Sequence, residues 1–235
     1  MKRSVPVLKL MPLYAMVLIG CISAAVLGSR AVTTMVESAP IEGRICFVID
    51  AGHGGIDGGA TSCTGIPESQ LNLEIALRLN DLLHFLGYDT KMIRTTDTSV
   101  YTEGNTIAAQ KVSDLKQRVK VVNETPNAFL ISIHQNTYPE GKYSGAQVFY
   151  ANDAHSKEMA EQLQTALRQS LNPASKRQCK SSDGIYLMQH IERPGVLIEC
   201  GFLTNPREED LLRSKEYQKK LACVIASSVS RYLSM

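Results

Sequence analysis

The stretch that decides the fold is residues 45–55, Ile-Cys-Phe-Val-Ile-Asp-Ala-Gly-His-Gly-Gly. Five apolar residues in a row, Ile45 to Ile49, predict a short strand that is buried on both faces, as in the middle of a parallel sheet. The run stops at Asp50, and His53 follows inside a loop rich in glycine. Glycine lets the backbone turn sharply and lets a ligand approach closely. The pattern therefore predicts a strand whose carboxyl end opens into a binding site.

Further apolar runs alternate with stretches of helical periodicity. The expected strands lie at 45–50, 90–94, 128–134, 146–150, 185–187 and 196–199. The expected helices lie at 71–86, 113–123, 153–171, 207–212 and 214–233. Strands that alternate with helices predict an α/β fold, here a mixed, largely parallel sheet of about six strands with helices on both faces.

Two histidines and two glutamates stand where such a sheet places its ligands. His53 follows the first apolar run, His134 ends another, Glu199 closes 196–198, and Glu68 opens a helix after the glycine loop. Ligands of open α/β sheets bind at the carboxyl ends of strands, so we expect these four side chains in one crevice. Two imidazoles and a carboxylate are the ligand set of a catalytic zinc site, and a second carboxylate can accept a proton from water. We predict His53, Glu68 and His134 as ligands of Zn²⁺ and Glu199 as the catalytic proton acceptor.

Each of these residues also has a plainer structural interpretation. His53 alone would fit a capping role, and His134 a hydrogen-bonded core histidine. Glu68 suits the first turn of a helix, where the dipole favours a carboxylate, and this role is compatible with metal binding. Glu199 could be the buried partner of a loop amide, although a carboxylate among apolar residues is costly unless it is paired or functional. Desolvation there is expected to raise the pKa of Glu199.

Several other polar residues are expected to lie outside this set. Phosphate binding by the glycine loop is disfavoured, because the chain has neither the dinucleotide nor the P-loop spacing. Glu74 is a rival acid, but it stands a turn or more inside its helix. We interpret His84 and His155 as structural or exposed, and His190 as a supporting residue behind the ligands. Four further polar residues are interpreted as surface or strand-end groups: Arg94, Asp97, Arg118 and Asn123.

Composition excludes some classes of function. The chain has 235 residues, a formal net charge of +2 and no Trp. A nucleic-acid partner is disfavoured, because no basic stripe with interleaved aromatic residues is present. None of the six cysteines forms a CxxC or zinc-finger spacing. Cys63 and Cys179 stand in polar loops and could pair in an oxidising compartment, a question that sequence leaves open.

The sequence of the N-terminus predicts a membrane segment. Lys2, Arg3 and Lys9 precede an apolar stretch, 10–27, that is long enough to cross a bilayer. We expect residues 1–28 to be an anchor or signal segment, 29–43 a linker, and 44–235 one catalytic domain. The positive-inside rule places the domain outside the membrane. An uncleaved anchor is favoured over a cleaved signal, with lipid modification of Cys21 as a further alternative.

Five ordered segments resemble the zinc-dependent N-acetylmuramoyl-L-alanine amidases of the third amidase family. They are IDAGHGGIDGGA at 49–60, Glu68 before Leu71-Asn72-Leu73, RTTD at 94–97, the stretch from Arg118 through ISIHQN at 131–136, and VLIECGFLTN at 196–205. Within the family, 144–150 and 184–187 look most like the sporulation-type, CwlD-like members. One departure is Gln135, where many members carry a small or apolar residue.

The resemblance implies hydrolysis of the amide between N-acetylmuramic acid and L-alanine in peptidoglycan, with formation of muramic-δ-lactam in the spore cortex. It also implies the ligand and base roles already assigned. Two alternatives stay open at this point. One is a zinc carboxypeptidase acting on the stem peptide. Its terminal carboxylate could be held by one basic set, Lys176, Arg177 and Lys180, although these three residues could equally be part of a solvent-exposed loop with no ligand. The other is a non-catalytic, membrane-tethered peptidoglycan binder.

Overall fold

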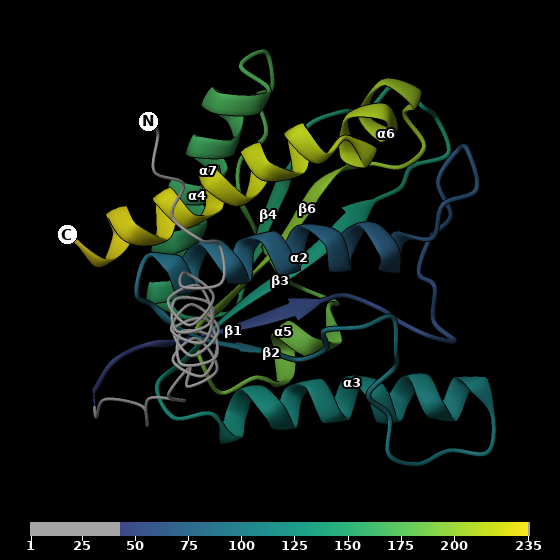
Figure 1. The fold of residues 1–235 in the computed structure, drawn as a ribbon, viewed down its shortest axis with the longest axis vertical. Coiled ribbons are helices and arrows are strands. Elements are labelled where there is room, and N and C mark those ends of the chain that lie inside the picture. Colours follow the sequence, from purple (N-terminus) through teal and green to yellow (C-terminus); the bar gives the residue numbers. More distant parts are fainter. Residues whose placement is uncertain (1–42, 235) are drawn as a thin grey trace, which may run out of the picture. The chain divides into compact units, whose positions relative to one another are not determined.

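The computed structural model describes residues 43–234, which lie in the compact unit Glu42–Met235. This part of the chain alternates between strands and helices as expected (Figure 1). In chain order, the elements are β1 (Cys46–Ala51), α2 (Glu68–Phe85), β2 (Asp89–Met92), α3 (Ile107–Glu124), β3 (Ala128–Asn136), β4 (Gln147–Tyr150), α4 (Ala154–Leu171), β5 (Lys180–Ser181), α5 (Tyr186–His190), β6 (Gly195–Phe202), α6 (Pro206–Arg213) and α7 (Lys215–Leu233).

The six strands form one mixed sheet in the order β2-β1-β3-β6-β4-β5. The strands β2, β1, β3 and β6 are parallel, whereas β4 runs antiparallel to β6 and parallel to β5. The expected α/β class, strand number and largely parallel sheet are confirmed. The strands β1 and β3 each lie between two other strands and are almost wholly buried, as their continuous apolar runs predict.

Helices cover both faces of the sheet. In Figure 1, α2 and α7 lie on one side and α3 and α5 on the other. The larger core lies under α2, α4 and α7, where Phe47, Ile131 and Ile198 meet Leu79 and Leu163. The smaller core holds the alternate strand residues, such as Val48 and Leu197, against α3 and α5. Successive strand residues point to opposite faces, so each central strand contributes to both cores.

The prediction of a strand at 185–187 is wrong. That segment enters the short helix α5, and the edge strand of the sheet is Lys180–Ser181 instead. A short apolar run fits a strand and a buried helical turn equally well by periodicity. Here the chain turns at Gly184, which has a φ of 88°, and Leu187 and Met188 then pack side by side into the smaller core.

The expected N-terminal anchor and linker, residues 1–28 and most of 29–43, lie outside the described residues. Within 43–234, no helix is both long and apolar enough to cross a membrane. Five cysteines belong to this part of the chain, and all five are free thiols in the structure, Cys63 and Cys179 included.

Candidate metal centre and active site

Three of the four predicted site residues converge on one point. Nε2 of His53 lies 3.3 Å from Oε2 of Glu68, and Nδ1 of His134 lies 3.0 Å from Oε1 of the same carboxylate. One ligand atom from each residue lies within 4.8 Å of the other two, and within 43–234 this is the one such cluster of metal-binding side chains. The donors are two imidazole nitrogens and a carboxylate, which suit a tetrahedral metal that keeps one open position.

Glycines in the loop after β1 make room for these side chains. A Cβ on Gly52 would stand 2.2 Å from Nε2 of His134, so the imidazole occupies the space that a side chain would need. A Cβ on Gly59, which has a φ of 69°, would stand 2.7 Å from both Oε2 of Glu68 and Cδ2 of His53. The glycine-rich sequence thus serves close packing of imidazole and carboxylate rather than phosphate binding.

His53 itself is held in a backbone conformation that favours glycine, with a φ of 61°. Its Nδ1 lies 2.8 Å from Oδ2 of Asp57, whose other oxygen lies 2.8 Å from Nζ of Lys111 on α3. A carboxylate on Nδ1 fixes the ring and leaves Nε2 facing Glu68. Burial opposes a charge on His53, but hydrogen bonds to Glu68 and Asp57 outweigh it and raise the pKa of His53 to about 9.

Glu68 is fixed by donors on every side. Oε2 accepts a hydrogen bond from the backbone N–H of Ala60, and Oε1 accepts from the backbone N–H of Gln135 and from Nδ2 of Asn72, each at 3.1 Å. Burial alone would raise the pKa of Glu68, but the bonds to His134 and His53 hold it well below its usual value. Glu68 is therefore an ionised carboxylate at the start of α2, as the sequence indicates.

Glu199 lies directly beside this cluster. On β6 it is in register with His134 on the neighbouring strand β3, and adjacent strands lie about 4.8 Å apart. Its Oε2 is buried and has no hydrogen-bond partner among residues 43–234, which argues against a role as partner of a loop amide. Burial is the largest cause that raises the pKa of Glu199, with nearby Glu68 adding to it, and the pKa reaches about 7.

Two buried arginines support the loop. The interpretation as a surface or strand-end group is wrong for Arg118, which is buried within α3, whereas Arg94 does stand just after the end of β2 but is buried. Arg94 donates to the backbone carbonyls of Ala51 and Gly52 at 2.8 and 3.0 Å. Arg118 donates to the carbonyls of Ala51 and His53 at 3.0 and 2.7 Å. The long side chains of both arginines place their guanidinium groups in the protein interior, where the backbone carbonyls of the loop accept their hydrogen bonds.

A cleft of about 340 Å³ opens at His53 and His134. Its walls come from α3 and from the turn into α5, and include Lys111, Leu115, Ile185 and Tyr186. The cleft therefore lies on the face of the sheet that carries the smaller core, beside the cluster of His53, Glu68 and His134.

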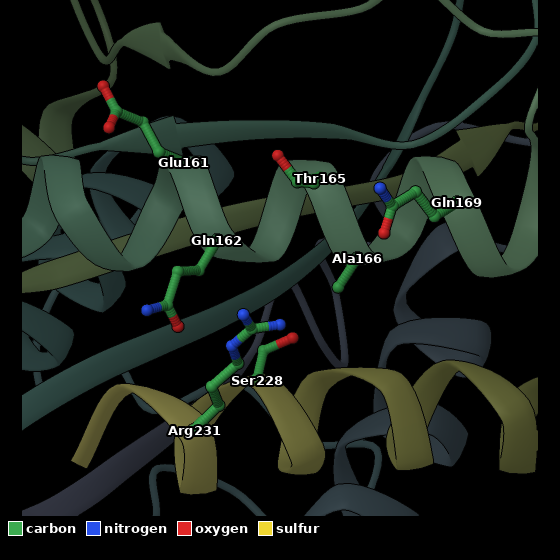
Figure 2. Close-up of a pocket in the computed structure, with 7 residues that line it drawn as sticks. All are labelled: Glu161, Gln162, Thr165, Ala166, Gln169, Ser228 and Arg231. Atoms are coloured by element: carbon green, nitrogen blue, oxygen red, sulfur yellow. The ribbon is translucent and has the colours of Figure 1, made fainter. Parts of the chain in front are cut away.

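A separate cavity of about 350 Å³ lies between α4 and α7 (Figure 2). It contains one acid and one base, Glu161 and Arg231, and its other lining residues are Gln162, Thr165, Ala166, Gln169 and Ser228. This lining has no His or Cys, so it offers no comparable donor set for a metal.

The remaining candidates lie away from the cluster. Glu74 is half-buried inside α2 and accepts hydrogen bonds from Gln70 and from Gln218 on α7. His84 and His155 are exposed. His190, expected behind the ligands, is exposed at the end of α5, where it stacks on Tyr186 and bonds to the carbonyl of that residue.

Comparison with known proteins decides the family. The family model described as N-acetylmuramoyl-L-alanine amidase matches residues 47–231. The chain belongs to this family. Its activity is that of an N-acetylmuramoyl-L-alanine amidase, and its substrate is peptidoglycan.

Individual amidases show the same likeness. The germination-specific N-acetylmuramoyl-L-alanine amidase of Bacillus subtilis is 41% identical over 199 residues, which are 84% of this chain and 83% of that protein. The CwlD amidase of Clostridioides difficile, solved in complex with the GerS lipoprotein, is 37% identical with a TM-score of 0.78, over 81% of this chain and 99% of that one. An N-acetylmuramoyl-L-alanine amidase from Clostridium difficile 630 is 32% identical with a TM-score of 0.70, over 81% and 97% of the two chains. The expectation of a CwlD-like amidase is confirmed.

Proposed function

We propose that this amidase is a zinc enzyme in which His53, Glu68 and His134 hold the ion and Glu199 carries the proton. The observation that supports this most directly is the convergence of two imidazoles and an ionised carboxylate on one point. Next to them lies Glu199, whose Oε2 is buried and has no hydrogen-bond partner among residues 43–234. A zinc ion held there would polarise the amide carbonyl and acidify a water molecule.

The residues themselves account for the proton transfers. A general base works best when its pKa lies near the working pH, and burial brings the pKa of Glu199 to about 7. Glu199 would accept a proton from the attacking water and deliver it to the nitrogen of the leaving L-alanine. Asp57 would keep His53 oriented, and Arg94 and Arg118 would keep the loop that carries it in place.

The proposed bond is the amide between the lactyl group of N-acetylmuramic acid and L-alanine. The products would be a peptide-free muramic acid and an intact stem peptide with a new L-alanine amino terminus. We further propose a role in the spore cortex, where peptide removal allows muramic-δ-lactam to form. The names of the Bacillus and Clostridioides relatives support this role.

We propose that residues 1–28 anchor the protein to the membrane, that 29–43 form a linker, and that 44–235 act outside the membrane. The basic residues before the apolar stretch 10–27 support this orientation. An accessibility assay on intact cells tests it: external protease or label should reach the domain, and a protected domain would contradict the assignment.

Mass spectrometry of muropeptides tests the reaction. Incubation of the full-length chain with peptidoglycan should release stem peptides that begin with L-alanine, whereas Glu199→Gln protein should release almost none. Shortened stems that remain on muramic acid would indicate a carboxypeptidase instead, and the absence of new ends would indicate a binder. Zinc content, measured on the same protein samples, should be one ion per chain and should be lost in His134→Ala.

A further inference from the structure

A second surface with its own chemistry lies near the metal-binding cluster. It is a groove of about 520 Å³ whose lining includes four basic side chains, Lys142, Lys176, Arg177 and Lys180. The other lining residues are Tyr143, Ser144, Gln147, Ser175 and Gln178, so no Asp or Glu lines it. We name it the basic groove.

The sheet topology places the basic groove at the edge that carries the active site. The strands β3 and β6 end at this edge, with His134 and Glu199 in register. Because β4 is antiparallel to β6, its first residue, Gln147, also lies at this edge and pairs with Glu199. The strand β5 is parallel to β4, so Lys180, at its start, lies at the same edge. Gln147 thus lies beside Glu199, and Lys180, which pairs with Phe149, lies two strands from β6 at the same edge.

Contacts with Phe202, Ser144 and Gln147 fix the orientation of the Arg177 guanidinium and leave one of its nitrogens free for a ligand. Its guanidinium lies 4.8 Å from the ring centroid of Phe202, the last residue of β6. Its Nε donates to the carbonyl of Ser144 at 3.0 Å, and one terminal nitrogen lies 3.4 Å from Oε1 of Gln147. Within 43–234, the other terminal nitrogen has no hydrogen-bond partner. A guanidinium fixed in this way loses little entropy when it binds a carboxylate.

Nearby acids leave the charge of the groove largely intact. Within 43–234, Lys176 and Lys180 form no ion pair. Lys142 pairs with exposed Glu140, beside the groove. Buried Glu208 accepts backbone hydrogen bonds from Gly145 at 2.7 Å and from Phe202 at 2.8 Å, one on each oxygen. The charge of Arg177 acts on the buried Glu208 carboxylate and opposes the rise in its pKa that burial causes. Within 43–234, no ion pair joins a carboxylate to Lys176, Arg177 or Lys180, so the groove presents these three cations to a ligand.

We propose that the basic groove binds a free carboxylate of the stem peptide and so positions the peptide for cleavage. This inference rests on the proposed function, because it concerns the same substrate at the same edge of the sheet. A peptide joined to muramic acid through L-alanine carries free carboxylates further along, at its acidic residues and its C-terminus. A fixed guanidinium flanked by lysines recognises a carboxylate by charge-assisted hydrogen bonds, whereas a neutral amide at that position forms weaker ones.

The test compares two substrates and three proteins. The substrates are a muramyl stem peptide with free carboxylates and its analogue with those carboxylates amidated. The proteins are the full-length chain, its Arg177→Met/Lys180→Met variant, and a control variant, Lys219→Met/Lys220→Met, which removes the same charge from an exposed face of α7. For the acidic substrate, the groove variant should raise KM about tenfold with little change in kcat, which corresponds to one charge-assisted contact. For the amidated substrate, all three proteins should have similar KM values.

A binding assay separates this proposal from the proposed function. Calorimetric titration of the free acidic stem peptide needs no turnover, and the groove variant should bind it about tenfold more weakly than the wild-type chain does. If the wild-type chain binds the peptide in this way but cuts neither substrate, the proposed function fails and the groove assignment stands. If the groove variant raised KM equally for the acidic and the amidated substrate, the groove assignment would be overturned. It would also be overturned if the groove variant left both KM and peptide binding unchanged. Circular dichroism and a melting curve should show that the groove variant is folded.

Discussion

Replacement of Arg118 by Met tests the support beneath the active-site loop. Arg118 is almost fully buried and forms an ion pair with buried Asp50 and another, at 2.5 Å, with Asp114. It also donates to the carbonyls of Ala51 and His53. Met has a similar length but no charge. The substitution therefore leaves Asp50 buried, and among residues 43–234 its one remaining side-chain hydrogen-bond donor is the hydroxyl of Ser132, at 2.7 Å.

The expected cost is large relative to the stability of a domain. Removal of one partner from a buried ion pair costs about 3–5 kcal/mol, because the other charge stays buried without compensation. With a urea m-value of about 2 kcal/mol/M, a loss of about 4 kcal/mol lowers the unfolding midpoint by roughly 2 M. Arg207 is exposed and forms no ion pair within 43–234, so Arg207→Met should change the stability by less than about 0.5 kcal/mol.

Urea unfolding followed by circular dichroism measures the effect. The double variant Asp50→Asn/Arg118→Met removes both charges and should recover part of the loss, which keeps the test informative even if the single variant folds poorly. A midpoint within about 0.3 M of wild type for Arg118→Met would refute the reasoning. It would show that water or another cation compensates Asp50.

The pH dependence of the same variant has a definite sign. Burial would raise the pKa of Asp50, but the charges of Arg118 and His134 and the hydrogen bond from Ser132 outweigh it and hold this pKa below the usual value of an Asp. In wild type, Asp50 therefore contributes stability that is present above about pH 4 and is lost as the pH falls through the lowered pKa. Without Arg118, burial is the largest remaining influence, and we expect the pKa of Asp50 to rise above the usual value of an Asp. The difference in urea midpoint between wild type and Arg118→Met should then shrink as the pH is lowered from 7 to 4.

Three further predictions concern the site itself. Asp57→Ala removes the carboxylate that bonds to Nδ1 of His53 and should weaken zinc binding about 10- to 100-fold, measured by competition with a chelator. An unchanged zinc affinity would show that Asp57 does not orient His53. Gly52→Ala introduces a Cβ that would stand 2.2 Å from the His134 ring, so purified protein should contain much less zinc by elemental analysis; full occupancy would show that the ring can move aside. Glu199→Gln should keep its zinc and lose about 10²-fold or more in turnover, and near-normal turnover would mean that another group is the base.

The fold was predictable because its signal is local and repeated. Continuous apolar runs such as 45–49 and 128–133 are typical of strands covered on both faces, and β1 and β3 have that position. Helix 154–171 lies almost where the apolar periodicity predicts it, and its N-cap is Asp153, whose side chain accepts from the backbone N–H of Ser156. The short edge strand 180–181 could not be predicted, because two residues carry no periodicity. The antiparallel direction of β4 depends on tertiary pairing, which the pattern of apolar residues does not encode.

The candidate site was predictable to the extent that each of its residues ends a strand or begins a helix. The position of His53, His134 and Glu199 at strand ends implies one edge of the sheet, and the structure brings them together there with Glu68. What the sequence did not reveal is the support of Glu68 by Asn72, since an amide inside a helix looks like any surface residue until its helix is placed.

The buried arginines show where a signal was present but incomplete. Asp50 follows directly on an apolar strand, and a carboxylate there requires a buried cation or several donors. The sequence therefore implies a partner for Asp50 without saying which residue provides it. Arg118 is 68 residues away on α3, and its identity depends on how that helix packs against the sheet. Because Arg118 also donates to the carbonyl of His53, the charge that compensates Asp50 simultaneously holds the loop that carries His53. A strand-end acid next to a candidate ligand is thus a reason to look for such an arginine among the helices that follow.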